Sequence, residues 1–190
     1  QKETISEALY EEAQDLLLIE LGLYDWQPTH RLTFIKDFSN TREAGRIDAE
    51  YFQPKYDEII HAIKSYKGGC DRLESLVTLK DRNFSTNDTR TYQYIELANI
   101  AGYGKITDCT TDKGQNLPTR ARRKVNTGDV IVSSIEGSLS SIALINHEYN
   151  NALCSTGFYI ISSEELNSET LLVFLKSTVG QLQLKKGCSG

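Results

Sequence analysis

The chain has 190 residues and a mass of 21.4 kDa, which suits one domain with a real core and is marginal for two. With 39% hydrophobic and 25% charged residues, the composition excludes a disordered or fibrous protein. The apolar run Leu16–Leu23 is interrupted by Glu20, and no basic segment precedes an apolar one, so neither a membrane span nor a signal peptide is predicted. The chain lacks methionine and starts with Gln1, which indicates a piece of a longer protein; a processed mature protein is the alternative.

Charge is distributed unevenly along the chain. The net charge of −5 argues against a protein that coats nucleic acid. Residues 1–68 contain 8 basic and 13 acidic side chains, whereas residues 69–190 contain 13 of each. Within residues 80–125 there are 9 basic and 5 acidic side chains, so an acidic front part precedes a locally basic middle.

The first predicted element is a helix over residues 3–22. Apolar side chains recur near the helical period at Ile5, Leu9, Ala13, Leu16, Leu17 and Leu21. Gly22 is suited to end the helix, because glycine adopts the left-handed conformation that follows a last turn. The apolar face of such a helix must be buried, either against the body of the domain or against another helix.

Residues 24–50 have no clear period and are predicted to be irregular. A second helix is expected from Lys55 to Tyr66, after Pro54 and before the Gly68-Gly69 pair. A last helix is expected from Ser168 to Lys185.

Short β-type runs follow Gly69, separated by Gly, Asn, Asp and Ser. The predicted strands are Leu76–Thr78, Tyr92–Leu97, Lys105–Asp108, Val130–Ser134, Ser141–Ile145 and Gly157–Ile161. Residues 80–91 and 113–124 are polar and lack apolar periodicity, so both are predicted to be loops. The expected fold class is therefore mixed α/β, a twisted sheet flanked by helices and preceded by a protruding N-terminal helix.

Catalytic and cofactor motifs are absent from the sequence. Neither a phosphate-binding loop nor a dinucleotide fingerprint is present, and the four cysteines and three histidines do not fall at zinc-ligand spacing. We therefore predict no cofactor and no metal. Cys154 with His147 as its base is an alternative, in which the chain is an enzyme; a small buried thiol is the plainer interpretation.

The two polar loops carry the side-chain types that bind nucleic acid. Arginine pairs with guanine and asparagine with adenine in the major groove, and lysine and arginine bind phosphates. The candidates for base edges are Arg82, Asn83, Asn87 and Arg90. The candidates for phosphate contacts are Lys80, Lys113, Arg120, Arg122, Arg123 and Lys124. Ser134, Glu136 and Ser138 follow a predicted strand and are further candidates, although they also fit a serine-rich turn around Gly137.

Five motifs in order resemble the target-recognition domain of the specificity (S) subunit of type I restriction-modification enzymes. They are GRIDAEYFQPKY at 45–56, YIELANI at 94–100, PTRARR at 118–123, GDVIVSS at 128–134 and ALCSTGF at 152–158. The preceding helix resembles the spacer helix that joins two such domains. The resemblance thus implies a spacer-helix fragment over residues 1–23 and a DNA target-recognition domain over residues 24–190. An S subunit or half-subunit with a single such domain is the alternative.

The resemblance also implies a function and partners. S subunits recognise one half of a bipartite duplex DNA target with each recognition domain, and they have no catalytic site. The methylation (M) subunits and the restriction (R) subunits carry the chemistry, so M and R subunits and double-stranded DNA are the expected partners in the cytoplasm. Pairing of two copies through the N-terminal helix is a further expectation. The alternative is a protein-interaction module whose basic loops bind an acidic partner instead of DNA.

Overall fold

The computed structural model describes residues 2–188, with side chains from residue 5 onward. These residues divide into two compact units. The helical unit consists of the residues up to Asp71 together with those from Thr178, and the sheet unit consists of Arg72–Ser177. The expected boundary between a spacer-helix fragment (residues 1–23) and a recognition domain (residues 24–190) stays a prediction.

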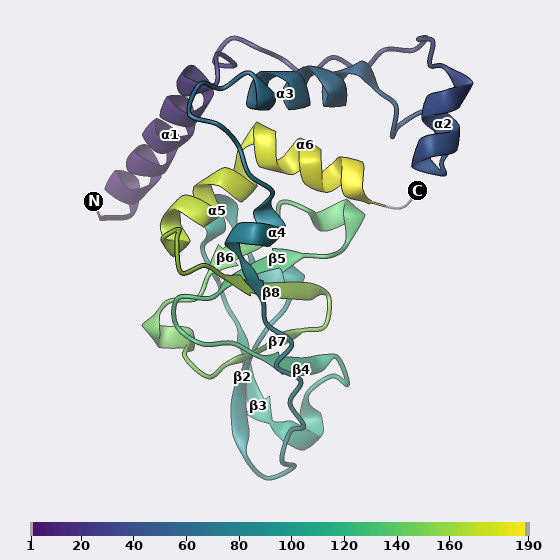
Figure 1. Ribbon diagram of the computed structural model, residues 1–190. Helices are drawn as coiled ribbons and strands as arrows, with labels where there is room; N and C mark the ends of the chain where they lie inside the picture. The colour runs from purple at the N-terminus through teal and green to yellow at the C-terminus, as the bar shows by residue number, and fades with distance from the viewer. Residues whose placement is uncertain (1, 189–190) are drawn as a thin grey trace. The chain divides into compact units, whose positions relative to one another are not determined.

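The helical unit contains four helices (Figure 1): α1 (Lys2–Glu20), α2 (Phe38–Ala44), α3 (Pro54–Lys64) and α6 (Thr178–Gly187). Helices α3 and α6 pack against each other, and Asp57 and Lys186 form an ion pair at 3.7 Å. Tyr56 and Ile59 are buried on α3, as its apolar period predicts. Two stretches of chain far apart in the sequence therefore form this unit together.

Helix α1 confirms the first predicted helix. It ends as expected, because Gly22 has a φ of 68° and the Leu23 N–H donates to the Leu18 carbonyl at 2.7 Å. Its apolar face is covered only in part by other described residues, since Ile5, Leu9 and Leu16 are each about 60% exposed, whereas Leu17 and Leu21 are half-buried. The predicted burial of this face is thus met only in part.

The segment predicted to be irregular contains one short helix, α2. None of its seven residues is buried, so it has no apolar face that a period in the sequence would reveal. It ends at Gly45, whose φ of 64° lies in the left-handed region.

The sheet unit contains two four-stranded sheets in place of one. Sheet A has the order β1-β8-β5-β6 and is antiparallel throughout; its strands are β1 (Thr78–Leu79), β8 (Phe158–Ser162), β5 (Val130–Ser133) and β6 (Ile142–Leu144). Sheet B has the order β3-β2-β7-β4; its strands are β3 (Thr110–Lys113), β2 (Thr91–Ile95), β7 (Leu153–Ser155) and β4 (Ala121–Lys124). In sheet B, β2 and β7 run parallel and the other pairs are antiparallel.

One apolar cluster joins the two sheets. Ile95 and Cys154 from sheet B pack with Ile131, Phe158 and Ile160 from sheet A, and all five are wholly buried. Burying a side chain as large as phenylalanine contributes about 1.5–3 kcal/mol. Helix α5 (Ser168–Lys176) packs on β5 and β6 of sheet A. Strand β3 of sheet B lies at the opposite end of the sheet unit from this helix (Figure 1).

Several predicted boundaries are corrected by the structure. The expected strand Lys105–Asp108 is not formed; only Ile106 bridges to Ile100, because Gly104 and Asp108 have positive φ angles on either side. The first strand begins at Thr78, after a short helix α4 (Leu73–Leu76), instead of at Leu76.

Two further elements differ from expectation. The last helix breaks at Ser177, whose ψ is 160° and whose hydroxyl donates to the Phe174 carbonyl, so α5 and α6 are separate. The second polar loop is in part a strand, since residues 121–124 pair with β7 as β4. Strand β7 itself was not among the predicted strands.

Candidate nucleic-acid interface

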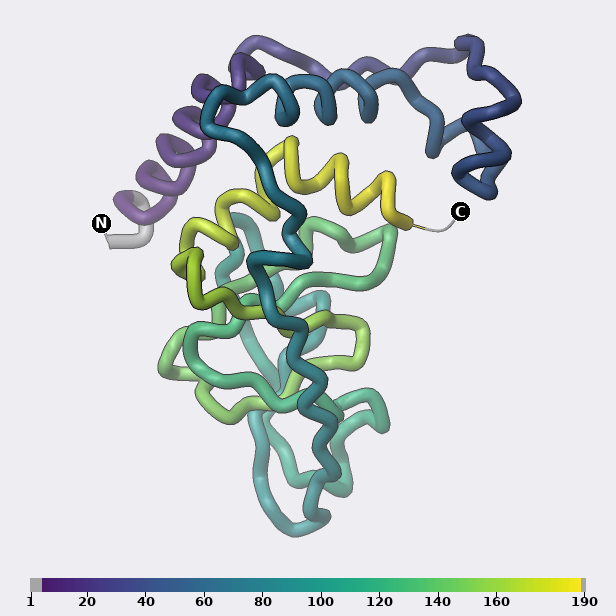
Figure 2. Tube along the Cα trace, in the orientation of Figure 1, coloured from purple at the N-terminus to yellow at the C-terminus, as the bar shows by residue number. Residues whose placement is uncertain are grey.

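The two basic segments, residues 80–91 and 113–124, lie side by side in the sheet unit. The Phe84 N–H donates to the Arg122 carbonyl at 2.6 Å, and the Lys124 N–H donates to the Arg82 carbonyl at 3.1 Å. Asn83 and Arg123 form an antiparallel bridge between them. Figure 2 traces the first segment along its extended path from β1 toward β2. Backbone pairing therefore presents both sets of cations from one framework.

A second contact fixes the far end of the first segment. The Gly114 N–H donates to the Arg90 carbonyl at 2.8 Å. Gly114 lies so close to the neighbouring loop that a Cβ there would be 2.3 Å from the Asn87 carbonyl oxygen. Glycine is therefore required at this position for the two segments to meet as they do.

Lys80 and Arg82 both bind the carboxylate of Asp129, which is only 1% exposed. Lys80 Nζ lies 3.1 Å from Oδ1, and an Arg82 guanidinium nitrogen donates to Oδ2. The Asn126 N–H donates to the same Oδ2 at 2.7 Å. These two cations thus anchor the first segment to the start of β5, and they compensate the buried charge of Asp129.

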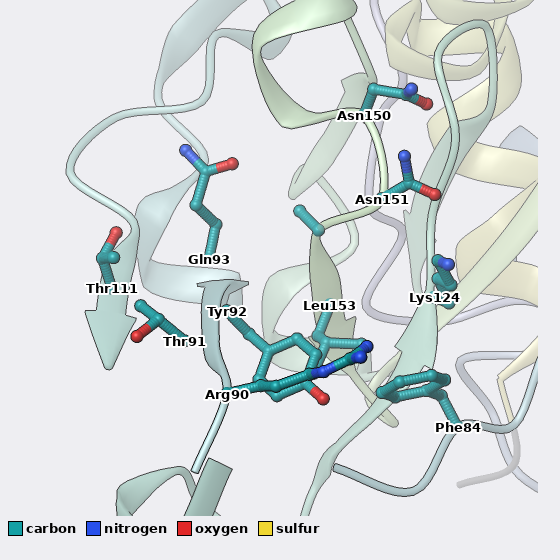
Figure 3. Close-up of a pocket in the computed structure, with 11 residues that line it drawn as sticks. Phe84, Arg90, Thr91, Tyr92, Gln93, Thr111, Lys124, Asn150, Asn151 and Leu153 are labelled. Atoms are coloured by element: carbon teal, nitrogen blue, oxygen red, sulfur yellow. The ribbon is translucent and has the colours of Figure 1, made fainter. Parts of the chain in front are cut away.

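An open pocket of about 430 Å³ lies beside the two segments. Figure 3 shows Gln93 and Thr111 on one side and Phe84 and Lys124 on the other, with Leu153 between them. The full lining consists of Phe84, Arg90, Thr91, Tyr92, Gln93, Thr111, Lys124, Asn150, Asn151, Ala152 and Leu153. Of the residues predicted from the sequence, the pocket therefore brings together Arg90 and Lys124.

Polar residues of the pocket that sequence reasoning missed come from β2, β3 and the segment before β7. They are Thr91, Gln93, Thr111, Asn150 and Asn151. The adjacent asparagines were the available signal, but a consecutive pair of that type also fits a simple turn. Only the meeting of three strands gives these amides a common site.

Two aromatic rings form part of the pocket wall. Phe84 and Tyr92 are half-buried, with ring centroids 5.7 Å apart in an edge-to-face arrangement. Lys124 Nζ lies 5.7 Å from the centre of the Phe84 ring, within the range of a cation–π contact. The Asn87 N–H donates to the Tyr92 hydroxyl at 3.1 Å and fixes that ring.

The remaining predicted arginines lie in different surroundings. Arg120 is exposed and forms an ion pair with Glu96 at 2.9 Å, and Arg122 is exposed beside it on β4. The Arg123 guanidinium donates to the Phe158 carbonyl and lies 6.0 Å from the Tyr159 ring centre. Arg123 is therefore committed to contacts within the sheet unit.

Ser134 lies close to Arg120, as the backbone contacts of the β7–β8 turn show. Its N–H and hydroxyl both donate to the Gly157 carbonyl, at 2.8 and 2.9 Å, and the Thr156 N–H donates to the Arg120 carbonyl at 3.0 Å. Glu136 and Ser138 follow in the short 3-10 helix η4 (Glu136–Ser138). Ser134 thus lies near Arg120, and none of the three candidates is part of the pocket lining.

Lys113 and Asn87 complete the predicted set. Lys113 is exposed at the end of β3. The Asn87 side-chain oxygen accepts hydrogen bonds from the Thr89 N–H and hydroxyl, at 3.0 and 2.8 Å, so it stabilises the loop that precedes β2.

The alternative nucleophile is in an unsuitable environment. Cys154 is completely buried, and this burial raises the pKa of its thiol to about 12. A reactive cysteine needs a lowered pKa and access to solvent. In the part of the chain described, no group of three or more His, Cys, Asp or Glu side chains could hold a metal ion, and none of the helices is long and apolar enough to cross a membrane.

Comparisons with known proteins found similarity among solved structures. No family model and no curated protein matches the chain. A crystal structure of the HsdS subunit from Thermoanaerobacter tengcongensis is 29% identical, with a TM-score of 0.49, over 54% of this chain and 27% of that one. A structure described as the basis of complex assembly and conformational transition of the type I R-M system is 28% identical, with a TM-score of 0.50, over 56% of this chain and 28% of that one.

The chain thus spans under a third of the length of the structures it matches. The match to the type I system confirms the resemblance that the five sequence motifs indicate.

Proposed function

We propose that this chain, which resembles a piece of a type I restriction-modification specificity subunit in its motifs and in its structure, recognises one half of a bipartite duplex DNA target. The recognition is assigned to the sheet unit. We further propose that the chain binds the methylation subunits and that the restriction subunits complete the assembly. The chain itself is proposed to be non-catalytic.

The observation that carries this proposal is the backbone pairing of the two basic segments. Hydrogen bonds at residues 82–84 and at Arg90 hold them together, so their side chains are positioned before DNA arrives. Preorganised side chains lose less conformational freedom on binding, which favours specific recognition. A flexible basic loop would supply affinity for phosphates but little discrimination among bases.

The roles of the individual residues follow from their contacts. Asn83, Asn87 and Arg90 are assigned to base edges, and Lys113, Arg120, Arg122 and Lys124 to phosphates. Lys80, Arg82 and Arg123 are assigned to holding the segments in place, because buried or backbone groups already bind them. Ser134, Glu136 and Ser138 are assigned to the edge of the interface near Arg120.

The net charge of −5 is compatible with DNA binding because the acidic excess lies in residues 1–68. These residues belong to the helical unit, whereas the basic segments belong to the sheet unit. Charges near the phosphates attract them most strongly, so the local excess of basic side chains in residues 80–125 favours binding of DNA by the sheet unit.

Selection from a pool of duplexes with a randomised central region tests the proposal. One short sequence should be enriched over successive rounds. Binding of the enriched duplex should weaken with salt at a log–log slope near −3.6 if about four cations neutralise phosphates. Equal binding of all duplexes, or binding of an acidic protein in their place, would support the protein-interaction alternative instead.

Docking of a methylation subunit is assigned to helix α1. Its side chains Ile5, Leu9, Leu16 and Ile19 are each 56–60% exposed, which is an apolar surface of the kind that partners cover. Replacing Leu9 and Leu16 by Ser should abolish copurification with the methylation subunits and leave duplex binding unchanged. If a second copy of this chain binds the same face, sedimentation experiments should show a dimer for the unchanged chain. The variant with Ser at positions 9 and 16 should then be a monomer.

A further inference from the structure

The pocket of sheet B arises where two parallel strands separate. β2 and β7 pair at only two positions, Tyr94 with Leu153 and Ile95 with Cys154. The residues before these pairs, 90–93 and 150–152, do not pair with each other and line the pocket from opposite sides. The result is an opening between backbone segments with an apolar floor at Leu153 (Figure 3).

The lining combines three kinds of chemistry in a space of about 430 Å³. Arg90 and Lys124 provide two cations, and no acidic side chain lines the pocket. Gln93, Asn150 and Asn151 provide amides, which donate and accept hydrogen bonds at once. Phe84 and Tyr92 provide aromatic surfaces that are half exposed.

Each of these three groups matches one part of a nucleotide. Aromatic rings stack on bases, side-chain amides pair with the edge of adenine, and cations bind phosphate. The pocket volume lies at the lower end of sites for small molecules, which fits a single nucleotide unit and no larger part of a strand. A base within an intact duplex cannot enter such a pocket, so the base must first leave its stack.

We propose that this pocket binds a single unstacked nucleotide, with an adenine-type base against Phe84 and Gln93 and its phosphate on Lys124. The proposal rests on the proposed function for the source of the nucleotide, which is a DNA strand at the interface. The pocket would thereby add a site for an extrahelical base to the recognition of base edges in the groove.

A free mononucleotide tests the chemistry of the pocket independently of duplex binding. Deoxyadenosine monophosphate added to the full chain should shift the NMR signals of the Gln93, Asn150 and Asn151 side-chain amides. Inorganic phosphate at the same concentration should leave them in place. If none of these amides moves with the nucleotide, or if phosphate alone moves all of them equally, the nucleotide site is overturned.

Duplex binding tests the source of the nucleotide. A duplex with one unpaired adenine should bind about tenfold more tightly than the flush duplex, because the cost of unstacking is already met. Phe84→Leu removes the aromatic face and Gln93→Ala removes the amide, and either should abolish this preference. Gln115→Ala, exposed and outside the pocket, is the matched control and should keep it.

The outcomes separate the two proposals. Absence of binding to any flush duplex overturns the proposed function, while the mononucleotide experiment still decides on the pocket. Equal affinities for flush and bulged duplexes, with amide shifts in the mononucleotide experiment, show that the pocket takes a free nucleotide and overturn the DNA source. Loss of the preference in Gln115→Ala as well would overturn the assignment to Phe84 and Gln93.

Discussion

The two sheets of the sheet unit differ in what their side chains face. All four residues of β5 in sheet A are buried, and helix α5 packs on the same sheet. In sheet B, β3 has no buried residue and β4 has one, Ala121. Sheet A therefore contributes its central strand β5 to the core, whereas sheet B uses its outer strands to present polar and charged side chains to solvent.

This difference shows how one unit combines stability with a binding surface. The inner strands of sheet B, β2 and β7, still contribute Ile95 and Cys154 to the common apolar cluster. The outer strands β3 and β4 are thus held on a rigid core by β2 and β7. Because their side chains are mostly exposed, packing places little constraint on which side chains they carry. Substitutions in the two regions should accordingly affect different measurements.

The largest expected effect concerns Cys154, which tests whether the core extends into sheet B. Alkylation of Cys154 in the native chain should be at least about a thousandfold slower than that of exposed Cys70, because it requires opening of the core. Mass spectrometry after iodoacetamide treatment measures both rates. Rapid, selective modification of Cys154 would contradict the burial of β7 and favour the enzyme alternative.

The same thiol gives a pH dependence with a defined sign. Burial raises the pKa of Cys154 to about 12, against an ordinary value of 9.0, so the folded chain keeps the thiol neutral. Its contribution to stability is complete below pH 9 and is lost as the pH rises toward 12. Denaturant titrations of the natural chain and of Cys154→Ala should therefore converge in this interval. Parallel stability curves from pH 8 to 11 would contradict the shift.

The second effect concerns the core of sheet A. Phe158→Ala should lower the free energy of unfolding by about 3–5 kcal/mol, because it removes a wholly buried ring from β8 and leaves a cavity. Thr111→Ala on exposed β3 should change it by less than about 0.5 kcal/mol. If urea titrations show equal losses of unfolding free energy for the two variants, the proposed difference in burial between β8 and β3 is wrong.

The third effect concerns the contact between the basic segments. Gly114→Ala places a Cβ 2.3 Å from the Asn87 carbonyl oxygen, so the first segment must move, at a cost of about 1–3 kcal/mol. We expect reduced discrimination among duplex sequences, measured by fluorescence anisotropy. Gly102→Ala, where no atom lies within 4 Å of the added Cβ, is the control. Unchanged discrimination in Gly114→Ala would show that the contact between Gly114 and Asn87 does not position the side chains assigned to base edges.

The smallest effect distinguishes two neighbouring arginines of sheet B. Arg122→Ala should flatten the salt dependence of DNA binding by about 0.9 in log–log slope, because an exposed phosphate contact is lost. Arg123→Ala should leave the slope unchanged and lower stability, since its guanidinium binds the Phe158 carbonyl. A reversed result would reassign the two side chains.

Much of sheet A could be predicted from the sequence, because buried strands carry continuous apolar runs. Val130–Ser133 and Phe158–Ser162 were found for this reason. The strands Thr110–Lys113 and Ala121–Lys124 were missed because they are exposed and carry threonine, lysine and arginine without alternation. Their pairing is decided by neighbouring strands and not by local sequence.

The site could be predicted only in part for a related reason. Arg90 and Lys124 were found from their residue type, but Gln93 and Asn151 share a pocket only because β2 and β7 diverge. The anchoring role of Asp129 depends on partners 47 and 49 residues away in the sequence, which no local pattern contains.

The insertion of the sheet unit between two pieces of the helical unit has a consequence for biosynthesis. A ribosome produces α3 well before α6, the helix against which it packs. Tyr56 and Ile59 therefore await their packing partner until the intervening strands have emerged. The strands of the sheet unit are synthesised during this interval, so they can begin to pair with one another before α3 and α6 pack.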